Sequence, residues 1–78
     1  MIAFEFDKGS DAHILFLDAA GIERLMSVLA EIKGKPDWHI HFMTPAKVAS
    51  LGGPADELGD KPRSGNTLLD HLIIYSTG

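Results

Sequence analysis

Residues 18–34 read DAAGIERLMSVLAEIKG, and this stretch decides the expected fold. Apolar side chains recur at positions i, i+3, i+4, i+7 and i+10, which are Ile22, Leu25, Met26, Leu29 and Ile32. This spacing places them on one stripe of a helix. Asp18 can cap the first turn, Gly34 can end the helix in a left-handed conformation, and Pro36 prevents its extension. The stretch therefore predicts a helix over about 19–33 that needs an apolar sheet face to cover it.

Four other stretches have the patterns of strands, and they lie at residues 2–7, 12–18, 38–43 and 67–76. The first two are joined by turn-rich residues, which predicts an antiparallel hairpin. One helix laid on one face of a sheet is a stable two-layer arrangement. We therefore expect an α+β fold: a β-β-α-β-β two-layer sandwich, in which one helix packs on a four-stranded, mostly antiparallel sheet.

The chain is expected to form a single α+β domain over residues 1–78, with a long loop at about 44–66. This loop holds three prolines and four glycines, and connections of such length in small domains are often functional. A domain of this size buries only about 60% of its unfolded surface. A small core favours self-association, for example as a homodimer, through a sheet edge or the outer sheet face.

Composition restricts the class of protein further. The chain has no cysteine, which excludes disulfides, thiolate metal sites and cysteine catalysis. Its formal net charge is −4, and it has no cluster of Lys and Arg, so we expect no nucleic-acid or anionic-membrane partner. The sequence shows neither a signal-peptide pattern nor an apolar run of the ~20 residues that a membrane span needs. We therefore expect a cytoplasmic protein.

Residues 37–43, DWHIHFM, place two histidines side by side on a strand. His39 and His41 alternate with Trp38, Ile40 and Phe42. Because residues i and i+2 of a strand point to the same side, we expect the histidines on the outer face of the sheet and the three apolar residues toward the helix. Trp38 is expected to seal one end of the core.

The other strands add to this outer face. With Leu72 and Ile74 directed at the helix, His71 and Tyr75 point outward. The expected outer face then carries Glu5, Asp7, His39, His41, Met43, His71 and Tyr75. The strand at 12–18 is apolar on both sides and leaves two registers open, in one of which His13 joins this face with Leu15 and Leu17.

Such a cluster of histidines is compatible with a metal site or with a catalytic site. A metal hypothesis takes His39, His41 and His71 as ligands of a zinc ion, with a carboxylate from Glu5, Asp7 or Asp70. A catalytic hypothesis uses a histidine as general base. However, the sequence contains no GxSxG elbow and no phosphate-binding loop, so we expect no enzyme and no cofactor, and zinc stays an alternative.

A third hypothesis is a protein-binding face. Interface centres are enriched in aromatic residues and methionine, which the outer face offers. The loop at 44–66 starts after His41 and ends before His71, so it would border this face. Its acidic residues Asp56, Glu57 and Asp60 would favour a basic partner and speed association.

Several stretches, in this order and spacing, carry a family resemblance. They are Phe4-Glu5-Phe6, DAAGIERLMSVLAEI at 18–32, the segment from His39 to Thr44, Gly52-Gly53 shortly before Glu57-Leu58, and NTLLDHLIIY at 66–75. Together they span about residues 2–76, and they resemble the immunity protein 32 family of bacterial polymorphic toxin systems. The resemblance implies a small cytosolic inhibitor that binds a cognate toxin without catalysis.

The sequence thus predicts a small cytosolic protein-binding module, an immunity protein that neutralises a bacterial toxin. The predicted partner-binding residues are His39, His41, Met43, Asp56, Glu57, His71 and Tyr75. The alternative is a small metal-binding or catalytic domain that uses the histidine cluster on the open sheet face.

Overall fold

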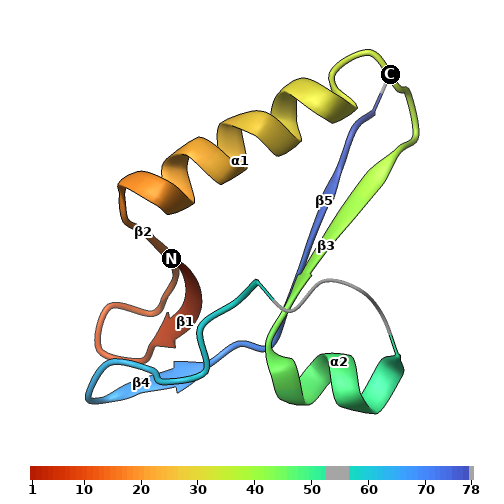
Figure 1. Ribbon diagram of the computed structural model, residues 1–78. Coiled ribbons are helices and arrows are strands. Elements are labelled where there is room, and N and C mark those ends of the chain that lie inside the picture. Colours follow the sequence, from red (N-terminus) through yellow and green to blue (C-terminus); the bar gives the residue numbers. More distant parts are fainter. Residues whose placement is uncertain (53–56, 78) are drawn as a thin grey trace.

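A computed structural model describes residues 1–52 and 57–77 (Figure 1). In these residues the protein is a small α+β fold with two helices and five strands in two antiparallel sheets. The elements in chain order are β1 (Ile2–Asp7), β2 (Ala12–Leu17), α1 (Ala19–Ile32), β3 (His39–Met43), α2 (Pro45–Leu51), β4 (Asn66–Leu68) and β5 (His71–Tyr75). Neither helix is long and apolar enough to cross a membrane.

The predicted single four-stranded sheet is wrong, because the last predicted strand divides into two. β4 pairs with β1 in a three-stranded sheet of order β2-β1-β4, and β5 pairs with β3 in a separate two-stranded sheet. The change of partner occurs between two successive residues. The Leu69 amide donates to the carbonyl of Phe4 in β1, and the carbonyl of Asp70 accepts from Thr44 just after β3. The chain therefore leaves one sheet and enters the other at Leu69–Asp70.

Leu58 connects the two sheets within the predicted loop. Its amide donates to the carbonyl of Met43 at the end of β3, and the next amide, of Gly59, donates to the carbonyl of Ile2 in β1. The Leu58 side chain is only 2% exposed and joins the core cluster. The predicted loop also contains α2, whose N-cap is Thr44. The segment is thus partly structured and holds β1 and β3 together.

The core lies between α1 and the inner faces of both sheets. Its buried residues are Ile2, Val28, Phe42 and Leu58, and the partly buried residues packed on them are Phe4, Leu15, Leu17, Leu25, Ile40, Leu72 and Ile74. The expected inward direction of Ile40, Phe42, Leu72 and Ile74 is confirmed. Trp38 does not seal the core as expected, because it is 50% exposed.

Helix α1 buries a narrower stripe than the apolar pattern predicts. Gly21, Val28 and Ile32 are buried, whereas three residues of the predicted stripe are exposed, namely Ile22 at 47%, Met26 at 63% and Leu29 at 45%. Two separate sheets offer the helix less continuous apolar surface than one four-stranded sheet would. The helix lies close to the N-terminus, since a Cβ added to Gly21 would be 2.0 Å from the carbonyl oxygen of Met1.

The ends of α1 are partly as predicted. Asp18 is the N-cap, and its side chain accepts from the Gly21 amide at 2.8 Å, as predicted. The predicted left-handed stop at Gly34 is wrong. The helix closes at Lys33 in a right-handed conformation, and the chain turns toward β3 at Asp37, which has a φ of 61°.

The register of the hairpin decides where His13 lies. β1 and β2 pair Ile2 with Leu17, Phe4 with Leu15 and Phe6 with His13. Paired residues share a sheet face, so His13 stands beside Phe6, with ring centroids 5.1 Å apart. Leu15 and Leu17 therefore pack on the core, and His13 does not join the other three histidines.

Candidate functional site

The outer face of the β3–β5 sheet brings three histidines and a tyrosine together. The pairing is His39 with Tyr75, His41 with Ile73 and Met43 with His71. We call these six residues the histidine face: His39, His41, Met43, His71, Ile73 and Tyr75. Paired side chains of a sheet point the same way, so the strands place on one surface the four histidine and tyrosine residues that the sequence analysis grouped there.

Ring contacts run along the whole face. The Nδ1 atom of His41 lies 2.7 Å from Nε2 of His71, and the ring of His39 lies 4.9 Å from that of His41 and 4.8 Å from that of Tyr75, measured between centroids. Tyr75 is 60% exposed and Ile73 is 40% exposed. The row His71–His41–His39–Tyr75 therefore forms a continuous aromatic surface with an open end at Tyr75.

The His41–His71 contact sets the protonation of the pair. At 2.7 Å one ring nitrogen must donate and the other accept, so the bond needs an unprotonated nitrogen. Burial lowers the pKa of His41 from its ordinary value, and the nearby charges of His39 and His71 lower it further. The hydrogen bond and the burial therefore both favour a neutral His41 near pH 7.

Three other predicted members of the site lie elsewhere or contribute little. Met43 is on the histidine face but is only 5% exposed. Glu57 borders the surface, and its carboxylate accepts from Nε and Nη2 of Arg24 at 2.7 and 3.1 Å. Asp56 lies outside the described residues. Of the predicted partner-binding residues, His39, His41, His71 and Tyr75 form the accessible group.

A groove of about 520 Å³ runs along the free edge of β3. Helix α1 forms one wall with Arg24 and Glu31, and Leu51 and Glu57 lie at the end near α2. Trp38 lines the groove at the start of β3, with the Lys35 ammonium 5.3 Å from the centre of its ring. The groove is lined by residues from both faces of β3, so it wraps around the edge of the strand.

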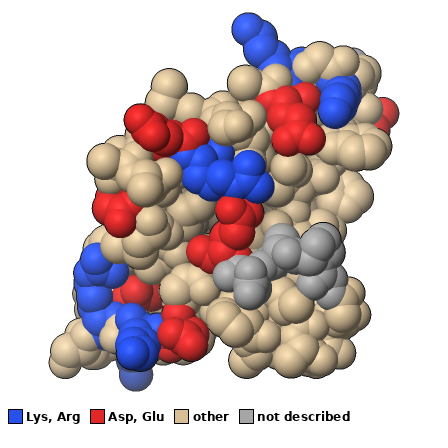
Figure 2. All heavy atoms as spheres, viewed as in Figure 1, with Lys and Arg blue, Asp and Glu red and all other residues tan. Residues whose placement is uncertain are grey.

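Charges of both signs are mixed around this region. Figure 2 shows Lys and Arg side chains beside Asp and Glu on the visible face, and an uncharged surface over α2. The large exposed side chains Leu51, at 57%, and Trp38, at 50%, lie at opposite ends of the groove. The groove therefore combines apolar anchors with a mixed polar rim, as protein interfaces do.

The metal hypothesis finds no preformed site in the part of the chain that the structure describes. No three or more His, Cys, Asp or Glu side chains there are arranged to hold a metal ion. His41 and His71 bond directly to each other, which occupies a nitrogen lone pair that a metal would need. Glu5 and Asp7, two of the expected carboxylates, lie on β1 in the other sheet. Zinc binding by His39, His41 and His71 stays a prediction.

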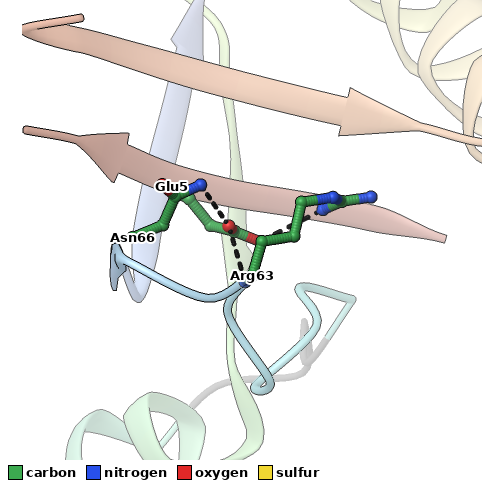
Figure 3. Close-up of polar contacts among 3 residues, drawn as sticks. All are labelled: Glu5, Arg63 and Asn66. Carbon is green, nitrogen blue, oxygen red and sulfur yellow. Dashed lines mark hydrogen bonds and ion pairs between the residues drawn. The ribbon is translucent and has the colours of Figure 1, made fainter. Parts of the chain in front are cut away.

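Glu5 is the polar residue whose environment the sequence analysis misses (Figure 3). Instead of lying on an outer face it is fully buried. Its Oε1 accepts from the Arg63 amide at 3.0 Å and from Nδ2 of Asn66 at 2.9 Å, and its Oε2 accepts from Nη1 of Arg63 at 3.3 Å. The Arg63 guanidinium lies 3.5 Å from the centre of the Phe16 ring. Glu5 thus attaches the segment that precedes β4 to β1.

These contacts keep Glu5 ionised. Burial raises the pKa of its carboxyl, but the hydrogen bonds from Asn66 and from the Arg63 amide, together with the Arg63 charge, outweigh it and hold the pKa below its ordinary value of 4.5. All buried side-chain polar atoms in residues 1–52 and 57–77 have a hydrogen-bond partner. Glu5 therefore has a structural role, and no local pattern around Phe4 and Phe6 predicts a partner some sixty residues away.

No family model, no curated protein and no solved structure matches the chain. The resemblance to the immunity protein 32 family therefore stays a prediction, and the function is argued from the histidine face and the groove beside it.

Proposed function

We propose that this chain is a small cytosolic protein-binding module that binds its partner through the histidine face. On the strength of the sequence resemblance, the partner is a bacterial toxin domain, and the chain is the immunity protein that neutralises it. No catalytic step is required, because occupying a toxin's surface is enough to inhibit it.

The exposed end of the histidine face is the observation that carries the proposal. Tyr75, at 60%, and Ile73, at 40%, are exposed beside the exposed ring of His39, while the opposite side of the same two strands packs on the core. A tyrosine supplies a large, rigid contact area with a polar tip, and such residues dominate binding energy at interface centres. A face that mixes exposed apolar, aromatic and polar side chains is better explained by the binding of a protein than by exposure to water alone.

Charge favours a basic partner. The chain has a net charge of −4, and Glu31 and Glu57 lie beside the face in the adjoining groove. Arg24 pairs with Glu57, and the Lys35 ammonium lies over Trp38, so it is the net charge of the chain, and not a local negative patch, that favours a basic partner. Such an arrangement raises association rates with a positively charged protein and makes them sensitive to salt.

Growth protection tests this proposal. Any toxin-domain gene that neighbours the gene for this chain is co-expressed with it, and growth is compared with cells that express the toxin alone. We expect the wild-type chain to restore growth and Tyr75→Ala to restore it poorly. Met26→Ala, which alters an equally exposed residue on α1, is the matched control and should protect fully. A toxin that the wild-type chain does not neutralise, or equal protection by the Tyr75 variant, would contradict the proposal.

Zinc binding is the second candidate, because the rings of His39, His41 and His71 lie in one row, and it requires the ion to displace the His41–His71 hydrogen bond. Protein purified without a histidine tag is titrated with zinc while its melting temperature is followed. A bound ion would raise the melting temperature by an amount that grows with the logarithm of the zinc concentration relative to the dissociation constant, and His41→Ala would abolish the rise. Unchanged melting in excess zinc would reject this candidate and leave the protein-binding proposal intact.

A further inference from the structure

The free edge of β3 presents unpaired backbone groups. The Ser76 amide donates to the carbonyl of Trp38, and the Thr44 amide donates to the carbonyl of Asp70, so the even-numbered residues of β3 bond to β5. In an antiparallel ladder, alternate residues bond to opposite sides. His39 and His41 therefore direct their N–H and C=O groups into the groove, away from β5.

Nothing in the described chain occupies these groups. The Leu58 amide reaches the same edge, but it bonds to the carbonyl of Met43 at the far end of the strand. No backbone bond from residues 1–52 or 57–77 meets the outward groups of His39 and His41. Natural edge strands are usually protected by a lysine, a proline or a bulge, whereas β3 reads HIHFM and has neither residue. Within the described residues, the edge at His39 and His41 is therefore open to another strand.

We infer that this edge pairs with β3 of a second copy, antiparallel, about a two-fold axis at Ile40. This register sets His39 opposite His41 of the second copy, and His41 opposite His39. Each of the two pairs exchanges two N–H···O bonds, which satisfies the outward groups of both residues. The result is a continuous sheet of order β5-β3-β3-β5, with the two histidine faces side by side.

The ends of the groove are complementary under the same rotation. Glu31 and Trp38 lie at the start of β3, where Lys35 bonds to Ile32 and Trp38 bonds to Lys35. Arg24 lies at the other end, because it pairs with Glu57 beside Leu58. An antiparallel partner therefore brings Glu31 toward the Arg24–Glu57 pair of the second copy. It also brings Trp38, 50% exposed, toward the 57% exposed Leu51.

The shape of the single chain agrees with an uncovered interface. The Cα radius of gyration is 13.1 Å, against ~11.5 Å for a compact domain of this length. The accessible surface is 5128 Å², against ~4,600 Å² for a monomer of this mass. Both values show that the single chain is more extended than an average domain of its mass, as expected where part of its surface is covered by a second copy.

This inference is independent of the proposed function. The dimer uses backbone groups on the edge of β3, whereas the toxin contact uses side chains of the histidine face, which stay accessible. A monomeric chain that neutralises a toxin would sink the dimer alone. A dimer that neutralises nothing would sink the function alone.

Proline substitution isolates the backbone contribution. His41→Pro removes an outward N–H that the β3–β5 pairing does not use, and edge strands accept proline. His41→Ala is the matched control, because it removes the same side chain and keeps the N–H. In sedimentation velocity of the full chain at increasing concentration, we expect dimer formation for wild type and His41→Ala. For His41→Pro with intact circular dichroism we expect a monomer. A wild-type monomer at several hundred micromolar, or a dimeric proline variant, would overturn the inference.

A single cysteine tests the register even if the proline variant does not fold. The chain has no native cysteine. On the two-fold axis, residue 40 of one copy would face residue 40 of the other in a non-hydrogen-bonded pair. The Cα separation of such a pair is about 4.5 Å, within the disulfide range of ~4.4–6.8 Å. Under mild oxidation Ile40→Cys should cross-link at least tenfold faster than Met26→Cys, although Met26 is far more exposed. Equal rates, or faster cross-linking at residue 26, would overturn the two-fold axis.

Discussion

Replacement of Glu5 tests the physical account of the fold most sharply. The carboxylate is fully buried and accepts three hydrogen bonds, two of them from Arg63. Glu5→Ala leaves the Arg63 amide and the Asn66 side-chain amide, both in part-buried bonds, without an acceptor. An unpaired donor costs up to about 1–3 kcal/mol where water cannot reach it. The Arg63 side chain is 48% exposed, so water can solvate its charge and limit the loss. We expect Glu5→Ala to lower the free energy of unfolding by about 3 kcal/mol.

Glu5→Gln should cost less. The glutamine oxygen can keep both bonds of Oε1, but its NH₂ group then faces Nη1 of Arg63, donor against donor. We expect a loss of about 1–2 kcal/mol. Glu57→Ala is the surface control, because it removes a carboxylate that also binds an arginine through two contacts. Glu57 and Arg24 have side-chain exposures of 31% and 45%, and exposed pairs contribute about 0–1 kcal/mol.

Urea unfolding measures these differences. Helix content by circular dichroism and the fluorescence of the single tryptophan should give coincident transitions. A chain of 78 residues has a total stability of only ~4–12 kcal/mol, so Glu5→Ala should shift the midpoint strongly with little change in slope. If Glu5→Ala costs no more than Glu57→Ala, the buried anchor described for Glu5 is not present in solution.

The pH dependence gives a second measurement on the same residue. The pKa of Glu5 is lower in the folded chain than its ordinary value of 4.5, so below that pH the unfolded chain binds the extra proton first. The contribution of Glu5 is therefore complete above pH 4.5 and is lost as the pH falls through the folded pKa. The Glu5→Gln variant should lack this part of the acid destabilisation. Equal acid profiles for the variant and the wild type would contradict the lowered pKa.

Three further predictions concern the helix and the histidines. Gly21→Ala should destabilise the protein by about 1–3 kcal/mol, because the added Cβ would collide with the Met1 carbonyl oxygen. Gly34→Ala adds a Cβ in open space and should change the melting temperature little. Equal melting temperatures for the two variants would refute the close approach at Gly21. Val28→Ala should lower the free energy of unfolding in urea by about 2 kcal/mol, because the Val28 side chain is fully buried. Met26→Ala should lower it by under about 0.5 kcal/mol. A larger loss for Met26→Ala than for Val28→Ala would show that α1 buries a different face. The pKa of His41 is lower in the folded chain than its ordinary value of 6.5, so the protein should lose stability as the pH falls below 6.5. His41→Gln should reduce that loss in urea unfolding. A wild type that becomes more stable below pH 6.5 would contradict the lowered pKa.

Local patterns in the sequence are enough to predict α1, the hairpin and the outward direction of His39 and His41. Each depends on residues a few positions apart, and periodicity of 3.6 or 2 reports such short-range order directly. The inward direction of Leu72 and Ile74 also follows, because only that choice gives α1 an apolar surface near β3. Because side chains alternate along a strand, this choice also places His71 and Tyr75 on the outer face.

The remaining features depend on contacts between distant segments. The break at Leu69–Asp70 exists because Phe4 and Thr44 bond to successive residues, which no pattern within NTLLDHLIIY reveals. Burial of Glu5 depends on Arg63, and the exposure of Met26 depends on how far each sheet extends beneath α1. A helical stripe predicts which side of a helix is apolar, but the width that is covered is set by its neighbours.

Calorimetric titration measures whether the purified chain binds a toxin domain encoded by a neighbouring gene. The account predicts saturable binding by the wild type, a loss of at least tenfold in affinity for Tyr75→Ala, which corresponds to about 1.4 kcal/mol, and unchanged affinity for Met26→Ala. No binding by the wild type, or equal affinities for the Tyr75 and Met26 variants, would contradict the claim that this chain binds a protein through its histidine face.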